Sequence, residues 1–166
     1  MEKTVFLIGM MGCGKSTVGR CLSGITGLPL CDLDEEIERF EGKSIPELFA
    51  EGGDAGFRRC ETAALLRACK TGPQIVATGG GIVTREENIS AMREHGVVVW
   101  LCRPLGDIIA TVRQDTRPNL AGDKEERMRT LYAQREALYK KAAHISLCNT
   151  MPPEEAANEI ARLIRL

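Results

Sequence analysis

One octapeptide constrains this chain more than any other feature. Residues 9–16 read Gly-Met-Met-Gly-Cys-Gly-Lys-Ser and fit the phosphate-binding pattern G-x-x-x-x-G-K-[ST]. In this pattern, glycines let backbone N–H groups and the positive end of the next helix approach phosphates closely. The lysine supplies a mobile charge for the β- and γ-phosphates of a nucleotide, and the final hydroxyl suits Mg²⁺. The residues expected to contact the nucleotide here are Gly12, Cys13, Gly14, Lys15, Ser16 and Thr17.

The sequence on either side of this loop supports the assignment. Residues 4–8 form a short apolar run of strand-forming residues, which predicts a buried strand entering the loop. After the loop, apolar residues recur at helical spacing at Val18, Cys21, Leu22 and Ile25. A glycine turn carrying an exposed lysine is the alternative, and a flanking strand and helix argue against it.

Composition limits the partners of the chain. It has 166 residues, of which 43% are hydrophobic, so we expect a single domain over residues 1–166 with a substantial core. A net charge of −1 gives no electrostatic basis for binding nucleic acid or an anionic membrane. No apolar run is long enough to span a bilayer, and the Met-Glu-Lys start does not resemble a signal peptide. We therefore expect a cytoplasmic monomer.

The seven cysteines form no C-x-x-C pair, and the two histidines complete no zinc pattern. The sequence predicts free thiols without a structural metal. Cys13 differs from the others because it lies in the phosphate-binding loop, beside Lys15 and a helix N-terminus. We expect thiol modification there to inhibit the protein and bound nucleotide to protect against it.

Strand and helix patterns alternate along the chain. This alternation predicts an α/β fold, a three-layer α/β/α arrangement around a five-stranded parallel sheet. The expected strands are 4–8, 29–32, 74–77, 97–101 and 145–148. The expected helices follow the phosphate loop and then lie near 34–41, 55–70, 85–94, 105–113 and 124–141, with a last one after Pro152. Residues 114–123 break the periodicity and form a candidate lid.

Ligands of parallel sheets bind beyond the carboxyl ends of the strands. Asp32 and Asp34 stand at the end of the second predicted strand, and two residues apart in an extended chain they would point to one side. One could serve a metal ion and the other a second substrate, although helix capping or solvation remains an alternative. Gly79, Gly80 and Gly81 follow the third strand, where either a ligand approaches the backbone closely or the loop is merely permissive.

Several arginines are candidates for binding anions. Arg135 falls on the apolar face of the helix predicted at 124–141, where a buried cation needs an anionic partner, either a ligand or a structural carboxylate. Arg58 lies three residues before Glu61, which could orient its guanidinium for a carboxylate or simply form a surface ion pair.

Two more arginines belong to the candidate lid. Arg117, followed by Pro118, could close over a phosphate in transfer, with a solvated loop arginine as the alternative. Arg113 could flank the adenine or the phosphates, or could equally be an ordinary surface residue.

Together these segments resemble the shikimate kinase family over essentially the whole chain. The resemblance rests on the phosphate loop, Asp32-Leu-Asp34, Phe57-Arg-Arg-Cys-Glu61, Gly79-Gly-Gly81, Arg117-Pro118 and Arg135-Glu-Ala-Leu-Tyr139, in that order. It implies a P-loop kinase of the nucleoside-monophosphate-kinase-like type, with a mobile lid at about 112–124 and a substrate-binding helical segment at about 33–61. The implied reaction is phosphorylation of the shikimate 3-hydroxyl by ATP.

The resemblance also implies residue roles. Shikimate would be held by Asp34, Arg58, Gly80 and Arg135, with Gly79 and Gly81 shaping the same wall. Lys15 and Arg117 would bind the phosphates, while Ser16 would hold Mg²⁺ directly and Asp32 through water. The implied catalytic residues are Lys15, Asp34 and Arg117.

Two alternatives stay open at this point. One is another small-metabolite kinase, such as a gluconate-type kinase, because that acid would also use an arginine. The other is a non-catalytic nucleotide-binding module, against which the intact set of Lys15, Ser16, Asp32, Asp34 and Arg117 argues.

Overall fold

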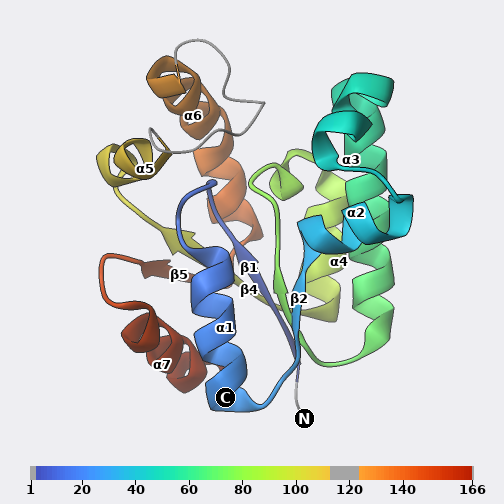
Figure 1. Ribbon diagram of the computed structural model, residues 1–166. Helices are drawn as coiled ribbons and strands as arrows, with labels where there is room; N and C mark the ends of the chain where they lie inside the picture. Colours follow the sequence, from blue (N-terminus) through green and yellow to red (C-terminus); the bar gives the residue numbers. More distant parts are fainter. Residues whose placement is uncertain (1–2, 113–123, 166) are drawn as a thin grey trace.

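The computed structural model describes residues 3–112 and 124–165. Arg113, Arg117 and nearly all of the predicted lid therefore lie outside the described residues. A five-stranded parallel sheet, ordered β2-β3-β1-β4-β5, forms the centre, with helices on both faces (Figure 1). The strands are β1 (Thr4–Ile8), β2 (Leu30–Asp32), β3 (Ile75–Ala77), β4 (Gly96–Cys102) and β5 (Ile145–Cys148). The predicted fold class is confirmed.

The helices divide between the two faces of the sheet. They are α1 (Lys15–Thr26), α2 (Leu33–Glu41), α3 (Ile45–Thr71), α4 (Glu86–His95), α5 (Leu105–Val112), α6 (Lys124–Ala142) and α7 (Pro153–Ile164), with a short 3₁₀ turn, η1, at Ile82–Thr84. One core lies between the sheet and α1 and α7, and the other lies between the sheet and the remaining helices. Alternate residues of β1 serve these two cores: Val5 and Leu7 face one, and Phe6 and Ile8 face the other.

The central position of β1 follows from its sequence. All five of its residues are buried, because a strand paired on both edges and covered on both faces excludes water from every side chain. Since the strands are parallel, their carboxyl ends share one edge of the sheet, and the phosphate loop follows β1 at that edge. The chain thus places the loop between the segments that follow β3 and β4.

Helix α3 differs from its prediction. It starts at Ile45 rather than near residue 55, with Ser44 and Glu47 forming a complete capping box. The chain kinks inside it at Gly53, whose φ of 65° and ψ of −167° are not helical. The kink separates the first turns from the part of α3 that carries Arg58 and Glu61. Within the described residues, no helix is long and apolar enough to cross a membrane.

Candidate functional site

The phosphate loop is held in a backbone conformation that requires glycine. Gly12 and Gly14 have φ values of 79° and 94°, which residues with a side chain rarely adopt. Gly9 has φ 146°, and a Cβ there would lie 2.7 Å from the Leu101 carbonyl oxygen and 2.8 Å from Cys13 Sγ. The glycines therefore form the loop and bring it into contact with the end of β4.

Lys15 folds back over the loop that it follows. Its Nζ donates to the carbonyl oxygens of Gly9 at 2.6 Å and Met10 at 2.9 Å, and it lies 3.7 Å from Cys13 Sγ. Cys13 has no exposed surface, so a thiol reagent can reach it only when the loop opens. The predicted inhibition by thiol modification thus requires loop opening and stays a prediction. Thr17 lies at an exposed position on the first turn of α1.

Two polar residues outside the motif support this loop. Arg103 follows β4 and donates to the Gly12 carbonyl oxygen at 2.8 Å. Asn149 follows β5 and donates through its side chain to the Cys13 carbonyl oxygen at 2.7 Å, while its backbone N–H donates to the Cys102 carbonyl oxygen at 2.6 Å. The sequence analysis assigned a role to neither, although each directly follows a strand of the structure, the position examined for the first three predicted strands.

Ser16 and Asp32 meet at the start of α2. The Ser16 hydroxyl donates to Asp32 Oδ2 at 3.0 Å. The other oxygen of Asp32 accepts the N–H groups of Asp34 at 3.1 Å and Glu35 at 3.3 Å, so Asp32 caps α2. The idea that Asp32 and Asp34 share one side of an extended strand is wrong, because Asp34 already lies in the first helical turn.

The donors at this position fit Mg²⁺. A serine hydroxyl and a carboxylate are hard oxygen ligands, and Mg²⁺ on nucleotides is usually held by one or two such groups together with phosphates and water. Within residues 3–112 and 124–165 there is no group of three or more Asp, Glu, His or Cys side chains that could bind a metal alone.

The three consecutive glycines after β3 form a wall beneath three charged side chains. A Cβ at Gly79 would lie 3.2 Å from Asp34 Oδ1, and one at Gly80 would lie 3.4 Å from Arg135 Nη1. A Cβ at Gly81 would overlap the guanidinium of Arg58. A Cβ at Gly79 or Gly81 would crowd the charged groups, which supports a close approach to the backbone over a merely permissive loop.

The wall also adjoins the phosphate loop. A Cβ at Gly80 would lie 3.3 Å from the backbone nitrogen of Met11 and 3.6 Å from the Gly9 carbonyl oxygen. Arg58, Asp34 and Arg135 thus converge beside the loop, although they come from three different helices. In Figure 1, α3 and α6 rise on opposite sides of this end of the sheet.

Arg58 is held by two carboxylates of its own helix, of which the sequence predicted Glu61. Its Nη1 lies 2.9 Å from Glu61 Oε1, and its Nε lies 3.6 Å from Asp54 Oδ1. The Glu61 side chain is only 1% exposed, so this is not a surface ion pair. Burial raises the pKa of Glu61, an effect that the attraction of Arg58 only partly offsets.

Arg135 lies on the inward face of α6, as predicted, with 8% of its surface exposed. One turn later, the hydroxyl of the fully buried Tyr139 donates to the Gly80 carbonyl oxygen at 2.5 Å. Burial raises the pKa of Tyr139 far above its ordinary value, so this hydroxyl stays protonated. Tyr139 therefore ties the glycine wall to the helix that carries Arg135, a role that the sequence analysis did not assign.

Comparisons with known proteins point to one family. A family model described as shikimate kinase matches residues 11–165. A protein named shikimate kinase from Nostoc punctiforme is 43% identical over 163 residues, covering 96% of this chain and 90% of its own. A solved structure described as shikimate kinase from Acinetobacter baumannii in complex with shikimate superposes with a TM-score of 0.94 at 34% identity, covering 99% of this chain and 93% of its own.

A more distant match bears on the alternative of a gluconate-type kinase. A gluconokinase structure from Sinorhizobium meliloti covers 98% of this chain and 93% of its own, with a TM-score of 0.60 at 16% identity. Identity at that level reflects a shared fold alone. The family match and the closer relatives favour the first interpretation, and this chain belongs to the shikimate kinase family of ATP-dependent phosphotransferases.

Proposed function

We propose that this chain transfers the γ-phosphoryl group of ATP to the 3-hydroxyl of shikimate, giving shikimate 3-phosphate and ADP. The observation that carries the proposal is the convergence of Asp34, Arg58 and Arg135 on a glycine wall that adjoins the phosphate loop. Two guanidinium groups suit the single carboxylate of shikimate, and a carboxylate suits its hydroxyl groups. The bound acid and the terminal phosphate of the nucleotide would then lie side by side.

In this proposal the acceptor is positioned mainly by preformed ion pairs. Glu61 and Asp54 fix the fork of Arg58, and Tyr139 fixes the wall beside Arg135. Asp34 orients the 3-hydroxyl and can take its proton as the bond to phosphorus forms. Because the transition state of phosphoryl transfer is loose, orientation contributes more than early proton removal.

On the nucleotide side, the loop N–H groups and Lys15 bind the phosphates. We assign Mg²⁺ to Ser16 directly and to Asp32 through water, where it would offset phosphate charge. Gly12, Cys13, Gly14 and Thr17 complete the proposed nucleotide contacts. Arg113 and Arg117, outside the described residues, are assigned to the nucleotide on sequence grounds alone, Arg117 as the cation that closes over the phosphoryl group.

The remaining parts of the proposal concern the whole molecule. It acts as one domain over residues 1–166, with a lid at about 112–124 and a substrate-binding segment at about 33–61. We infer that it acts as a cytoplasmic monomer. We propose ATP and shikimate as its partners, and neither nucleic acid nor membrane, because a net charge of −1 gives no electrostatic basis for binding either polyanion.

ADP release measured with ATP and Mg²⁺, with and without shikimate, tests the proposal directly. We expect release to depend on shikimate, with gluconate giving little or none. Equal release with and without the acid would contradict the acceptor, and nucleotide binding without any transfer would favour a non-catalytic module.

The variant Asp34→Asn tests the site itself. It removes the charge that orients the hydroxyl and leaves the phosphate loop untouched, so we expect transfer to fall by about 10²-fold or more while nucleotide affinity stays unchanged. Glu35→Gln, at an exposed position in the same helical turn, is the matched control. Wild-type turnover in Asp34→Asn would refute the assignment.

A further inference from the structure

Two cysteines end neighbouring strands of the sheet. Cys102 is the last residue of β4, Cys148 is the last residue of β5, and the two are register partners. The residues before them, Leu101 and Leu147, both pack in the core beneath α1 and α7. Since side chains alternate along a strand, both cysteines point to the opposite face, where α6 lies.

The backbone spacing at this pair suits a covalent link. Neighbouring strands lie about 4.8 Å apart, which falls inside the Cα separation that disulfides accept. Both thiols are free, and Cys148 is exposed. Strand β5 is at the edge of the sheet and pairs with β4, so a shift of its end breaks no hydrogen bond to a further strand.

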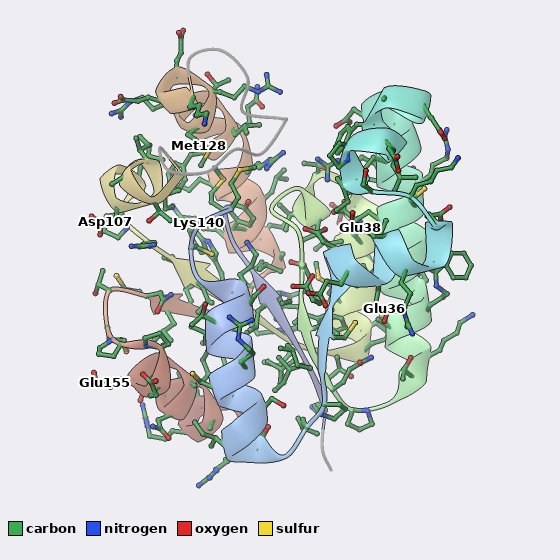
Figure 2. All side chains as sticks on the ribbon, in the orientation of Figure 1. Glu36, Glu38, Asp107, Met128, Lys140 and Glu155 are labelled. Carbon is green, nitrogen blue, oxygen red and sulfur yellow. The ribbon has the colours of Figure 1, made fainter. Side chains whose placement is uncertain are left out.

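The charges around the pair come from α6. Glu136 raises the pKa of Cys102 and Lys140 lowers it. Lys140 lies on the part of α6 close to the strands in Figure 2. Burial raises the pKa of Cys102 to about 11, and the sulfur of Cys148 adds to this rise. The two sulfurs therefore share one environment, in which the exposed Cys148 meets a solution reagent first.

Each cysteine directly precedes a residue that holds the phosphate loop. Arg103 follows Cys102 and donates to the Gly12 carbonyl oxygen, and Asn149 follows Cys148 and donates to the Cys13 carbonyl oxygen. The Asn149 N–H also donates to the Cys102 carbonyl oxygen, which joins the two strand ends. A change in the spacing of these ends is transmitted to the loop through two hydrogen bonds.

We propose that Cys102 and Cys148 form a reversible disulfide by exchange with a small-molecule disulfide such as oxidised glutathione, and that this link weakens nucleotide binding. The Cys148 thiolate attacks one glutathione sulfur, so a mixed disulfide forms and one glutathione thiolate leaves. Cys102, whose raised pKa makes loss of its proton the slow step, is then deprotonated, and its thiolate attacks Cys148 Sγ and releases the second glutathione thiolate. Both cysteine protons end on glutathione, which is reduced while the pair is oxidised.

The full chain treated with oxidised glutathione tests the proposal. We expect the intact mass to fall by two hydrogens, with one linked peptide joining Cys102 to Cys148. Binding of a fluorescent ADP analogue should weaken about fivefold to tenfold, which corresponds to losing one or two ordinary hydrogen bonds, and dithiothreitol should restore it. This readout involves no phosphoryl acceptor, so it stands apart from the test with shikimate.

Three variants sharpen the result. Cys102→Ser and Cys148→Ser should bind the analogue like the reduced wild type and lose the response to glutathione, and the exposed position of Cys148 makes its variant a safe test of folding. Cys69→Ser, on α3 far from the pair in the chain, should respond like the wild type. A lone glutathione adduct on Cys148, a linked peptide through other cysteines, or unchanged affinity in the linked protein would each overturn the proposal.

Discussion

Tyr139→Phe isolates the contribution of one hydroxyl to this site. The hydroxyl donates to the Gly80 carbonyl oxygen at 2.5 Å, and the ring is fully buried and stacks on Trp100 with ring centroids 5.7 Å apart. Phenylalanine keeps the ring and its packing, so the variant removes the hydrogen bond without opening a cavity.

The magnitude follows from the burial of the two partners. Tyr139 is fully buried, whereas Gly80 is only half-buried, so its carbonyl group recovers part of its solvation from water. We therefore expect a loss of about 1–2 kcal/mol in the free energy of unfolding, toward the low end for an unpaired acceptor. For a chain of this size, that loss lowers Tm by about 2–8 °C.

The functional effect should be confined to the acceptor side. Gly80 faces Arg135, so a loosened wall misplaces this guanidinium, and we expect KM for shikimate to rise about fivefold with KM for ATP unchanged. Thermal unfolding followed by circular dichroism and steady-state kinetics provide the two measurements. Tyr132→Phe, at a half-buried position of the same helix, is the control. Wild-type Tm together with wild-type KM for shikimate would refute this reasoning.

Two further substitutions probe the same wall. Gly81→Ala places a Cβ on the Arg58 guanidinium, so kcat/KM for shikimate should fall about tenfold or more with nucleotide affinity unchanged. Steady-state kinetics measure this change, and a wild-type kcat/KM for shikimate would exclude a role for this contact. In Glu61→Gln, a titrating group is lost. Because the pKa of Glu61 is raised in the folded state, its protonation stabilises the wild type at low pH, and that contribution to the free energy of unfolding is lost as pH rises. The free energy of unfolding of the variant minus that of the wild type should therefore increase from pH 4 to pH 8 in denaturant titrations. A decrease over this range would contradict the direction of the pKa shift.

Local patterns predicted the parts of the site that depend on neighbours in sequence. The phosphate loop, the pairing of Arg58 with Glu61 and the inward position of Arg135 all follow from spacing along one segment. The helix predicted at 55–70 covers only the part of α3 after Gly52 and Gly53, two residues of low helix propensity. The structure instead bends the chain at Gly53 and continues.

The contacts missed by the sequence analysis depend on strand order. Arg103 and Asn149 reach the phosphate loop because β4 pairs with β1 and β5 pairs with β4, an order that spacing along the chain does not encode. The bond from Tyr139 to Gly80 likewise joins residues 59 positions apart. Asp34 lies in the first turn of α2 and not on the extended end of β2, since the helix starts one residue earlier than expected.

The position of Lys15 means that a bound phosphate must replace hydrogen bonds that the lysine already makes within the protein. Its ammonium group is already solvated by the Gly9 and Met10 carbonyl oxygens, at 2.6 and 2.9 Å. An arriving phosphate competes with these internal ligands, so the affinity gained from the lysine is the difference between two well-satisfied states. Lys15 therefore holds the loop through these carbonyl oxygens until a nucleotide phosphate takes their place. The stability of this segment and its binding of anions thus depend on one side chain.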